Sequence, residues 1–157
     1  MLARHPHAVI LARAGLARLG RVDEVTESLD PLQMLPAPGQ GALAIECRAD
    51  DTDLVAALAA LDDPATRASV VAERAVLATL EAGCSAPVGA LAEVVEGDDG
   101  PELWVRAIAL SEDGALSVRM SASGPIGDAA GVGTRLAEEM LVDGAADLMQ
   151  TPMKRHA

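Results

Sequence analysis

The clearest alternation of apolar and polar positions lies in the second half of the chain. Asp63 and Pro64 predict the start of a helix that runs to about Glu81, because Asp is a favoured N-cap and Pro a favoured first helical residue. Its apolar side chains lie near one face, as expected for a helix that covers a core: Val70, Val71, Ala75, Leu77 and Leu80. Gly83 is the expected C-terminal cap of this helix.

Three strand-like stretches follow this helix and are separated by Asp-Gly turns, which is typical of an antiparallel meander. The strands are expected at about 88–96, 102–110 and 115–122, and further helices at about 128–142 and 145–149. The last stretch, QTPMKRHA, has the composition of a frayed tail. Residues 62–157 are therefore predicted to form a small α+β domain with a three-stranded antiparallel sheet and packed helices.

The first 60 residues follow a different pattern. Residues 7–12 predict a short buried strand that leads into a short helix closed by Gly20. A loop with two glycines then precedes a second expected strand at 42–48 and an Ala/Leu helix at 52–61, capped by Asp50 or Asp51. No preceding strand or helix supplies neighbours for the strand at 7–12, so we interpret it as a piece of a larger α/β domain whose remainder is missing or on another chain.

Composition and charge narrow the possible partners. Half of the 157 residues are apolar, but Phe and Tyr are absent and Trp104 is the one aromatic residue, so the core must be aliphatic. The net charge of -12 argues against nonspecific binding to nucleic acid or to an anionic membrane. The longest apolar runs are too short for a membrane span or a signal peptide, and the cytoplasm is the expected location.

The most informative candidate for chemistry is Cys84, in the stretch LEAGCSAPVG at 80–89. Cys47 lies in an apolar run, where a buried structural cysteine is expected, whereas Cys84 lies among Gly, Ser and Pro at a helix exit. The residue type alone is compatible with four roles for Cys84: a nucleophile, a metal ligand, an attachment point or inert packing. A zinc site is disfavoured because the histidines lie at the two ends of the chain. A redox role is weak because no second cysteine is close in sequence.

Two further residues are candidates for binding. Gln40, in PAPGQGALAIECR, offers a donor and an acceptor between two glycines, although a plain loop before a strand explains the same residues. Arg18, on the short helix after residue 12, suits a carboxylate ligand, although an exposed helical arginine is commonly just solvated.

The stretches VILARAGLARLG, LPAPGQGALAIECRADD, AERAVLATLEAGCSAPVGA and LAEEMLVDGA together resemble the porphobilinogen deaminase (hydroxymethylbilane synthase) family. They occur in the family's order and cover about residues 8–150. The resemblance implies a transferase that joins four porphobilinogen molecules into hydroxymethylbilane and releases ammonia, in tetrapyrrole and haem biosynthesis. It implies a dipyrromethane cofactor held by a thioether on Cys84. It also implies that Arg18 and Gln40 contact the substrate, whose acetate and propionate groups are bound by arginines.

The resemblance also implies three domains, of which this chain carries remnants of two α/β (periplasmic-binding-protein-like) lobes followed by the C-terminal domain. Residues 1–38 match the tail of the second α/β lobe and the hinge, and 39–61 match the return strand and helix of the first lobe. Residues 62–157 match the C-terminal cofactor-attachment domain. The catalytic aspartate is expected in an N-terminal half, so no catalytic residue is assigned here. We expect the chain to be inactive alone and to need a complementing half, as in a split enzyme. The alternative is a noncatalytic binding or oligomerisation module.

Overall fold

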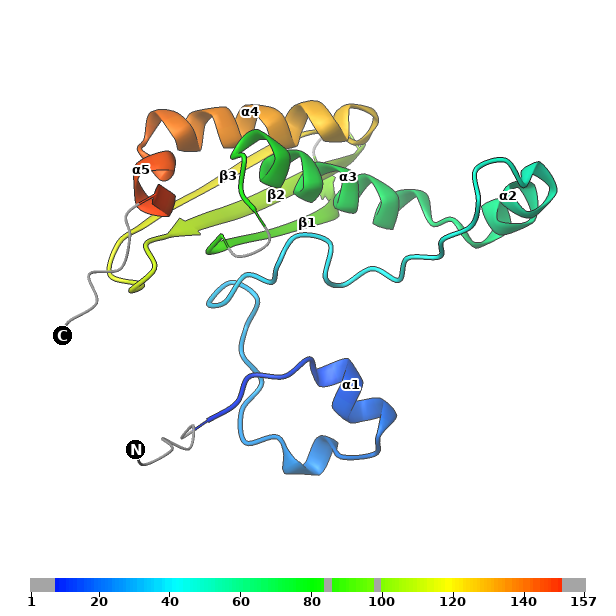
Figure 1. Ribbon diagram of the computed structural model, residues 1–157, viewed down its shortest axis with the longest axis horizontal. Helices are drawn as coiled ribbons and strands as arrows, with labels where there is room; N and C mark the ends of the chain where they lie inside the picture. Colours follow the sequence, from blue (N-terminus) through cyan, green and yellow to red (C-terminus); the bar gives the residue numbers. More distant parts are fainter. Residues whose placement is uncertain (1–7, 84–85, 98–99, 151–157) are drawn as a thin grey trace. The chain divides into compact units, whose positions relative to one another are not determined.

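The computed structural model describes residues 8–83, 86–97 and 100–150 (Figure 1). They fall into two compact units, Met1–Gln33 and Met34–Ala157, each described here by itself. The elements are α1 Arg13–Arg18, α2 Thr52–Leu58, α3 Pro64–Thr79, β1 Val88–Gly97, β2 Gly100–Leu110, β3 Ser117–Pro125, α4 Ala129–Val142 and α5 Ala145–Gln150. Short 3-10 helices occur at Val22–Glu24, Ala59–Leu61 and Ile126–Asp128. None of the helices in the described part of the chain is long and apolar enough to cross a membrane.

The second unit contains the predicted three-stranded antiparallel sheet, in the order β1-β2-β3. Helices α3 and α4 cover one face of it (Figure 1). The strand register brings the core-facing positions into line, so that Ala92 lies opposite Val105 and Val105 lies opposite Ala122. The largest fully buried side chains are all aliphatic or Met, as the composition requires: Leu103, Leu136, Met140, Val76, Val105 and Val132. The α+β expectation for this region is confirmed.

Helices α3 and α4 approach each other closely at Gly133. A Cβ atom at this position would overlap the carbonyl oxygen of Ala72 and would lie 2.9 Å from the Cβ of Ala75. Ala72 and Gly133 are both buried, so a side chain here has no open space to occupy. The two helices therefore pack backbone against backbone, and the small residues of this alanine-rich sequence make that possible.

The start of α3 agrees with the sequence prediction. The Asp63 side chain accepts a hydrogen bond from the Thr66 N–H at 2.7 Å, and Pro64 is the first helical residue. This N-cap satisfies one of the amides that a helix start leaves unpaired. Asp51 caps α2 in the same way, through the Leu54 N–H at 3.1 Å.

We expect the Asp63 cap to make stability pH-dependent in the acid range. The hydrogen bonds from Thr66 hold the pKa of the Asp63 carboxyl below its ordinary value of 3.8. Because the folded state favours the ionised form, the stabilisation is present above pH 3.8 and is lost as the pH falls below it. Asp63→Asn keeps an accepting oxygen but does not titrate. Urea unfolding from about pH 5 to about pH 3 should show a smaller loss of stability in the variant. Equal losses in the two proteins would contradict this role.

The end of α3 differs from the prediction, because Gly83 is not its cap. The left-handed residue is Glu81, with φ of 51°. The Glu81 N–H donates to the Ala78 carbonyl at 3.1 Å, and the Ala82 N–H donates to the Leu77 carbonyl at 3.2 Å. These two bonds form a Schellman motif, which satisfies the last helical carbonyls. The motif closes two residues before Gly83, so the helix ends earlier and a non-glycine residue takes the left-handed position.

Replacing Glu81 by glycine is expected to stabilise the second unit. A non-glycine residue in the left-handed region costs about 1–2 kcal/mol. The greater freedom of glycine in the unfolded chain offsets part of the gain. We therefore expect Glu81→Gly to raise the free energy of unfolding by about 0.5 kcal/mol. Glu81→Ala removes the same carboxylate without relieving the backbone, so it is the matched control. An equal increase in the free energy of unfolding, measured in urea, for Glu81→Gly and Glu81→Ala would contradict the backbone explanation.

The first unit contains the predicted short helix but not the predicted strand. Helix α1 ends at Arg18, and the turn after it is closed by Gly20, whose φ is 68°, while the Arg21 N–H donates to the Leu16 carbonyl at 2.9 Å. Residues 8–12 are not a strand, so the expectation for 7–12 is wrong over its described part. A strand needs a hydrogen-bonded neighbour, and no described residue pairs with this stretch. Its apolar side chains are instead exposed: Val9, Ile10 and Leu11.

The second expected strand, at 42–48, is also absent from the structure. Leu43 is 87% exposed and Ile45 is 61% exposed, so these residues do not contribute to the core. The expectation of a strand at 42–48 is therefore wrong, since a strand needs a hydrogen-bonded neighbour and no described residue pairs with this run. The helix predicted at 52–61 is confirmed as α2 followed by a 3-10 turn.

Candidate functional site

Cys84, the principal candidate, lies outside the described residues, but both flanks of its loop are described. On one side the loop leaves α3 through the Schellman motif at Glu81. On the other side the Pro87 carbonyl accepts a hydrogen bond from the Leu110 N–H at 3.0 Å, which attaches the loop to the end of β2. The Ala86 N–H also donates to the Gly83 carbonyl at 2.9 Å. The Cys84 loop is thus anchored at both ends to one framework.

A pocket of about 570 Å³ lies at the base of this loop. It is lined by residues 79–83, 86 and 87 of the loop flanks, and by Glu112, Leu141, Ala146 and Met149. Its volume is in the range of small-molecule sites. Among the described residues that line it, the charged ones are Glu81 and Glu112, and both are acidic.

Gln40 lies in a tight turn, and its side chain supports that turn. Pro38 and Gly39, with φ of 75° at Gly39, occupy the central positions of a type II turn. The Gln40 N–H donates to the Ala37 carbonyl at 3.1 Å, and Gln40 Oε1 accepts from the Ala37 N–H at 3.2 Å. The oxygen is therefore used within the turn, and a ligand would meet the Nε2 amide group.

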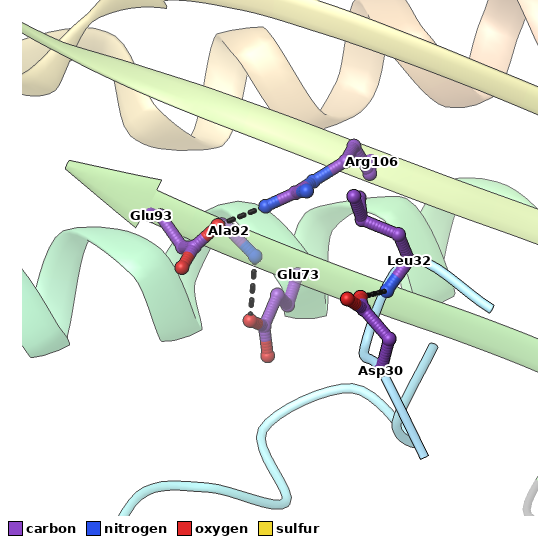
Figure 2. A network of polar contacts seen from close by, with 6 residues as sticks. All are labelled: Asp30, Leu32, Glu73, Ala92, Glu93 and Arg106. Atoms are coloured by element: carbon purple, nitrogen blue, oxygen red, sulfur yellow. Dashed lines mark hydrogen bonds and ion pairs between the residues drawn. The ribbon is translucent and has the colours of Figure 1, made fainter. Parts of the chain in front are cut away.

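The sequence reasoning missed Glu73, a buried carboxylate in the middle of α3. Its side chain is 6% exposed. Oε2 accepts from the Gly39 N–H at 2.5 Å. Oε1 accepts from the Ala92 N–H of β1 at 2.8 Å, and Figure 2 shows this second bond. The signal that would have identified it is an acidic residue on the helix face that carries Ala72 and Val76, because a buried carboxylate requires partners.

The segment before this turn covers the outer edge of β1. The Ala90 N–H donates to the Pro36 carbonyl at 2.9 Å, next to the bond between Ala92 and Glu73. Leu35 is buried over Gly89, where an added Cβ would lie 3.0 Å from both the Cβ and the carbonyl oxygen of Leu35. The glycine thus permits the close approach, and the edge strand is protected from pairing with another chain.

The sheet face opposite the helices carries Arg106, an arginine that takes part in a stacking contact and an ion pair. The Arg106 guanidinium lies 4.5 Å from the centroid of the Trp104 ring, and its Nη2 pairs with Glu93 on β1 (Figure 2). Arg106 is buried, and its Nε has no hydrogen-bond partner among the described residues. Stacking and ion pairing give this arginine a structural role in the sheet.

The two remaining candidates, Arg18 and Cys47, lie far from the Cys84 loop in the sequence. Arg18 is the last residue of α1 in the first unit, and it is exposed. Cys47 is a free, half-buried thiol in the second unit. The described residues contain no group of three or more His, Cys, Asp or Glu that would hold a metal ion. Arg18 belongs to the first unit and Gln40 to the second, and Cys84 lies outside the described residues.

Two models of known protein families match the chain in succession. The model "Porphobilinogen deaminase, dipyromethane cofactor binding domain" matches residues 2–56. The model "Porphobilinogen deaminase, C-terminal domain" matches residues 68–142. The second match covers most of α3 and α4 and all three strands, and it spans the Cys84 loop.

Curated relatives give the same result. A porphobilinogen deaminase of Mycobacterium tuberculosis (strain ATCC 25618 / H37Rv) is 58% identical over 147 residues, which covers 90% of this chain and 48% of the relative. Those of Mycobacterium leprae (strain TN) and Nocardia farcinica (strain IFM 10152) are 57% and 58% identical over the same length, with 47% and 42% of each relative covered. The chain therefore spans about half the length of the curated relatives it matches.

Proposed function

Because the chain belongs to the porphobilinogen deaminase family, we propose that it supplies the C-terminal, cofactor-carrying part of a hydroxymethylbilane synthase. The assembled transferase would join four porphobilinogen molecules and release ammonia, in the cytoplasm. The observation that carries the proposal is the identity of 58% with a porphobilinogen deaminase over 147 residues. It is supported by the α+β fold that surrounds the Cys84 loop.

The proposed domain division follows the order of the family. Residues 1–38 would belong to the second lobe and hinge, 39–61 to the first lobe, and 62–157 to the cofactor-attachment domain. The last region carries the sheet and its own aliphatic core, which supports its assignment as a separate domain. The exposed apolar side chains at 8–12 and 42–48 are the ones that further strands of the two lobes would cover.

Cys84 is proposed as the attachment point of the dipyrromethane. A thiolate is a strong nucleophile toward an electrophilic carbon and forms a stable thioether, which explains the residue type. The described lining of the adjacent pocket does not favour the rest of the group. Groups built from porphobilinogen carry acetate and propionate arms, whereas Glu81 and Glu112 line this pocket. The arms are therefore proposed to lie outside it, and no reaction step is assigned to the pocket.

Arg18 and Gln40 are proposed to contact the substrate from the hinge and lobe segments. An exposed guanidinium such as that of Arg18 can form bidentate bonds with a carboxylate. The Gln40 turn leaves the Nε2 amide to donate to the ligand, since Oε1 already accepts from Ala37. Both roles rest on positions within the matched family model.

The proposal is tested by mixing this chain with the N-terminal half of a relative. Porphobilinogen consumption and ammonia release are measured for each chain alone and for the mixture. Turnover is expected in the mixture and not with this chain alone. Turnover by this chain alone would contradict the proposed dependence on a second half. A stable complex without turnover would instead support the noncatalytic binding module.

A further inference from the structure

We propose that Glu73 is a positioning residue, which fixes the turn that carries Gln40 to the framework that carries the Cys84 loop. The contact itself is independent of the reaction, and its meaning for catalysis rests on the proposed function. Glu73 belongs to α3, which ends at the N-terminal flank of the Cys84 loop. Its partner Ala92 belongs to β1, which begins at the C-terminal flank. Its second partner, Gly39, precedes Gln40.

The burial of Glu73 indicates that the carboxylate is there for its hydrogen bonds. Moving a carboxylate out of water costs free energy unless its oxygens are satisfied. Both oxygens are used, and each accepts from a backbone N–H of a different segment, at 2.5 Å and 2.8 Å. An apolar side chain would fill the same space beside Ala72 and Val76 without that cost. Packing alone therefore does not explain a glutamate at this position.

The geometry of the turn explains why Gly39 is the donor. Pro38 has no N–H, and the Gln40 N–H is used within the turn by the Ala37 carbonyl. The Gly39 N–H is the central amide of the type II turn and points away from it, toward Glu73. With Ala90 bonded to Pro36, this contact fixes the 36–39 segment to β1 and α3 at two points. The orientation of the following residue, Gln40, is thereby fixed as well.

The variant Glu73→Gln separates this role from packing. Glutamine has nearly the same shape but offers one accepting oxygen, and its Nε2 group would face a second N–H donor. One of the two bonds should therefore be lost while the core stays filled. In nitrogen–proton NMR spectra of the full chain, we expect the amide proton of Gly39 or Ala92 to shift upfield. Its exchange with solvent should become about tenfold faster. Glu81→Gln removes an exposed carboxylate at the end of the same helix and is the matched control.

Local and global effects have different signatures in this experiment. Faster exchange confined to residues 36–41 and to β1 supports the proposal. Unchanged Gly39 and Ala92 signals, or a rise of equal size in α4 and β3, would overturn it. If Glu73→Gln does not fold, through-hydrogen-bond couplings in the wild type decide the question. Couplings from the Gly39 and Ala92 nitrogens to the Glu73 carboxyl carbon are expected, and their absence would overturn the proposal. No substrate is used, so failure of the turnover assay leaves this test unaffected.

Discussion

Replacing Gly133 by alanine is expected to destabilise the second unit by about 3 kcal/mol, at the upper end of the usual cost of overpacking a core. The new Cβ would overlap the carbonyl oxygen of Ala72 and press on the Cβ of Ala75. Backbone atoms cannot rotate away as the end of a flexible side chain can, so α3 and α4 must separate. Alanine has the higher helix propensity, by about 1 kcal/mol, and this gain does not offset the clash.

Urea unfolding of Gly133→Ala measures this cost directly. Gly127→Ala is the matched control, because a Cβ at Gly127 meets nothing within 4 Å and its φ is not in the left-handed region. Gly127 lies just before α4, so the same part of the chain is changed. Wild-type stability in Gly133→Ala would contradict the close packing of α3 on α4. A loss in Gly127→Ala as large as that in Gly133→Ala would also contradict it.

Replacing Cys84 by serine is expected to reduce turnover of the complemented enzyme to background. Serine preserves the size of the side chain, but its hydroxyl is not a thiolate and does not form the thioether that we propose for Cys84. The loop is anchored at both ends by α3 and β2, so folding of the second unit should be unaffected. The unfolding midpoint of Cys84→Ser should match that of the wild type.

Cys47→Ser is the matched control for this substitution. Cys47 is a free, half-buried thiol in a segment without regular structure, and no role in attachment is proposed for it. The complemented Cys47→Ser enzyme should therefore turn over porphobilinogen at close to the wild-type rate. Loss of turnover in Cys47→Ser with retention in Cys84→Ser would reverse the assignment.

The parts of the fold that the sequence predicted are those set by local chemistry. Asp63 and Pro64 marked the start of α3, and the Asp-Gly turns marked the meander, because caps and turns depend on a few adjacent residues. The strands expected at 7–12 and 42–48 failed for the opposite reason. A strand depends on neighbours far away in sequence, and the described residues supply none for Ile10 or Ile45.

The family was predictable from sequence motifs, whereas the contacts near the candidate site were not. The stretch around Cys84 identified the family, and two family models agree with it. The contact between Glu73 and Gly39 joins residues 34 positions apart, and no local pattern predicts such a pair. The closure of α3 at Glu81 was missed because glycine is the usual left-handed residue and Gly83 lies nearby.

The central claim is that Cys84 carries the cofactor, and mass spectrometry of the protein tests it most directly. The chain is produced together with the N-terminal half of a relative, and its mass is measured intact and after proteolysis. The account predicts an increment equal to a dipyrromethane on the peptide that contains Cys84, and an unmodified Cys47 peptide. An unmodified Cys84 in a complex that turns over porphobilinogen would contradict it.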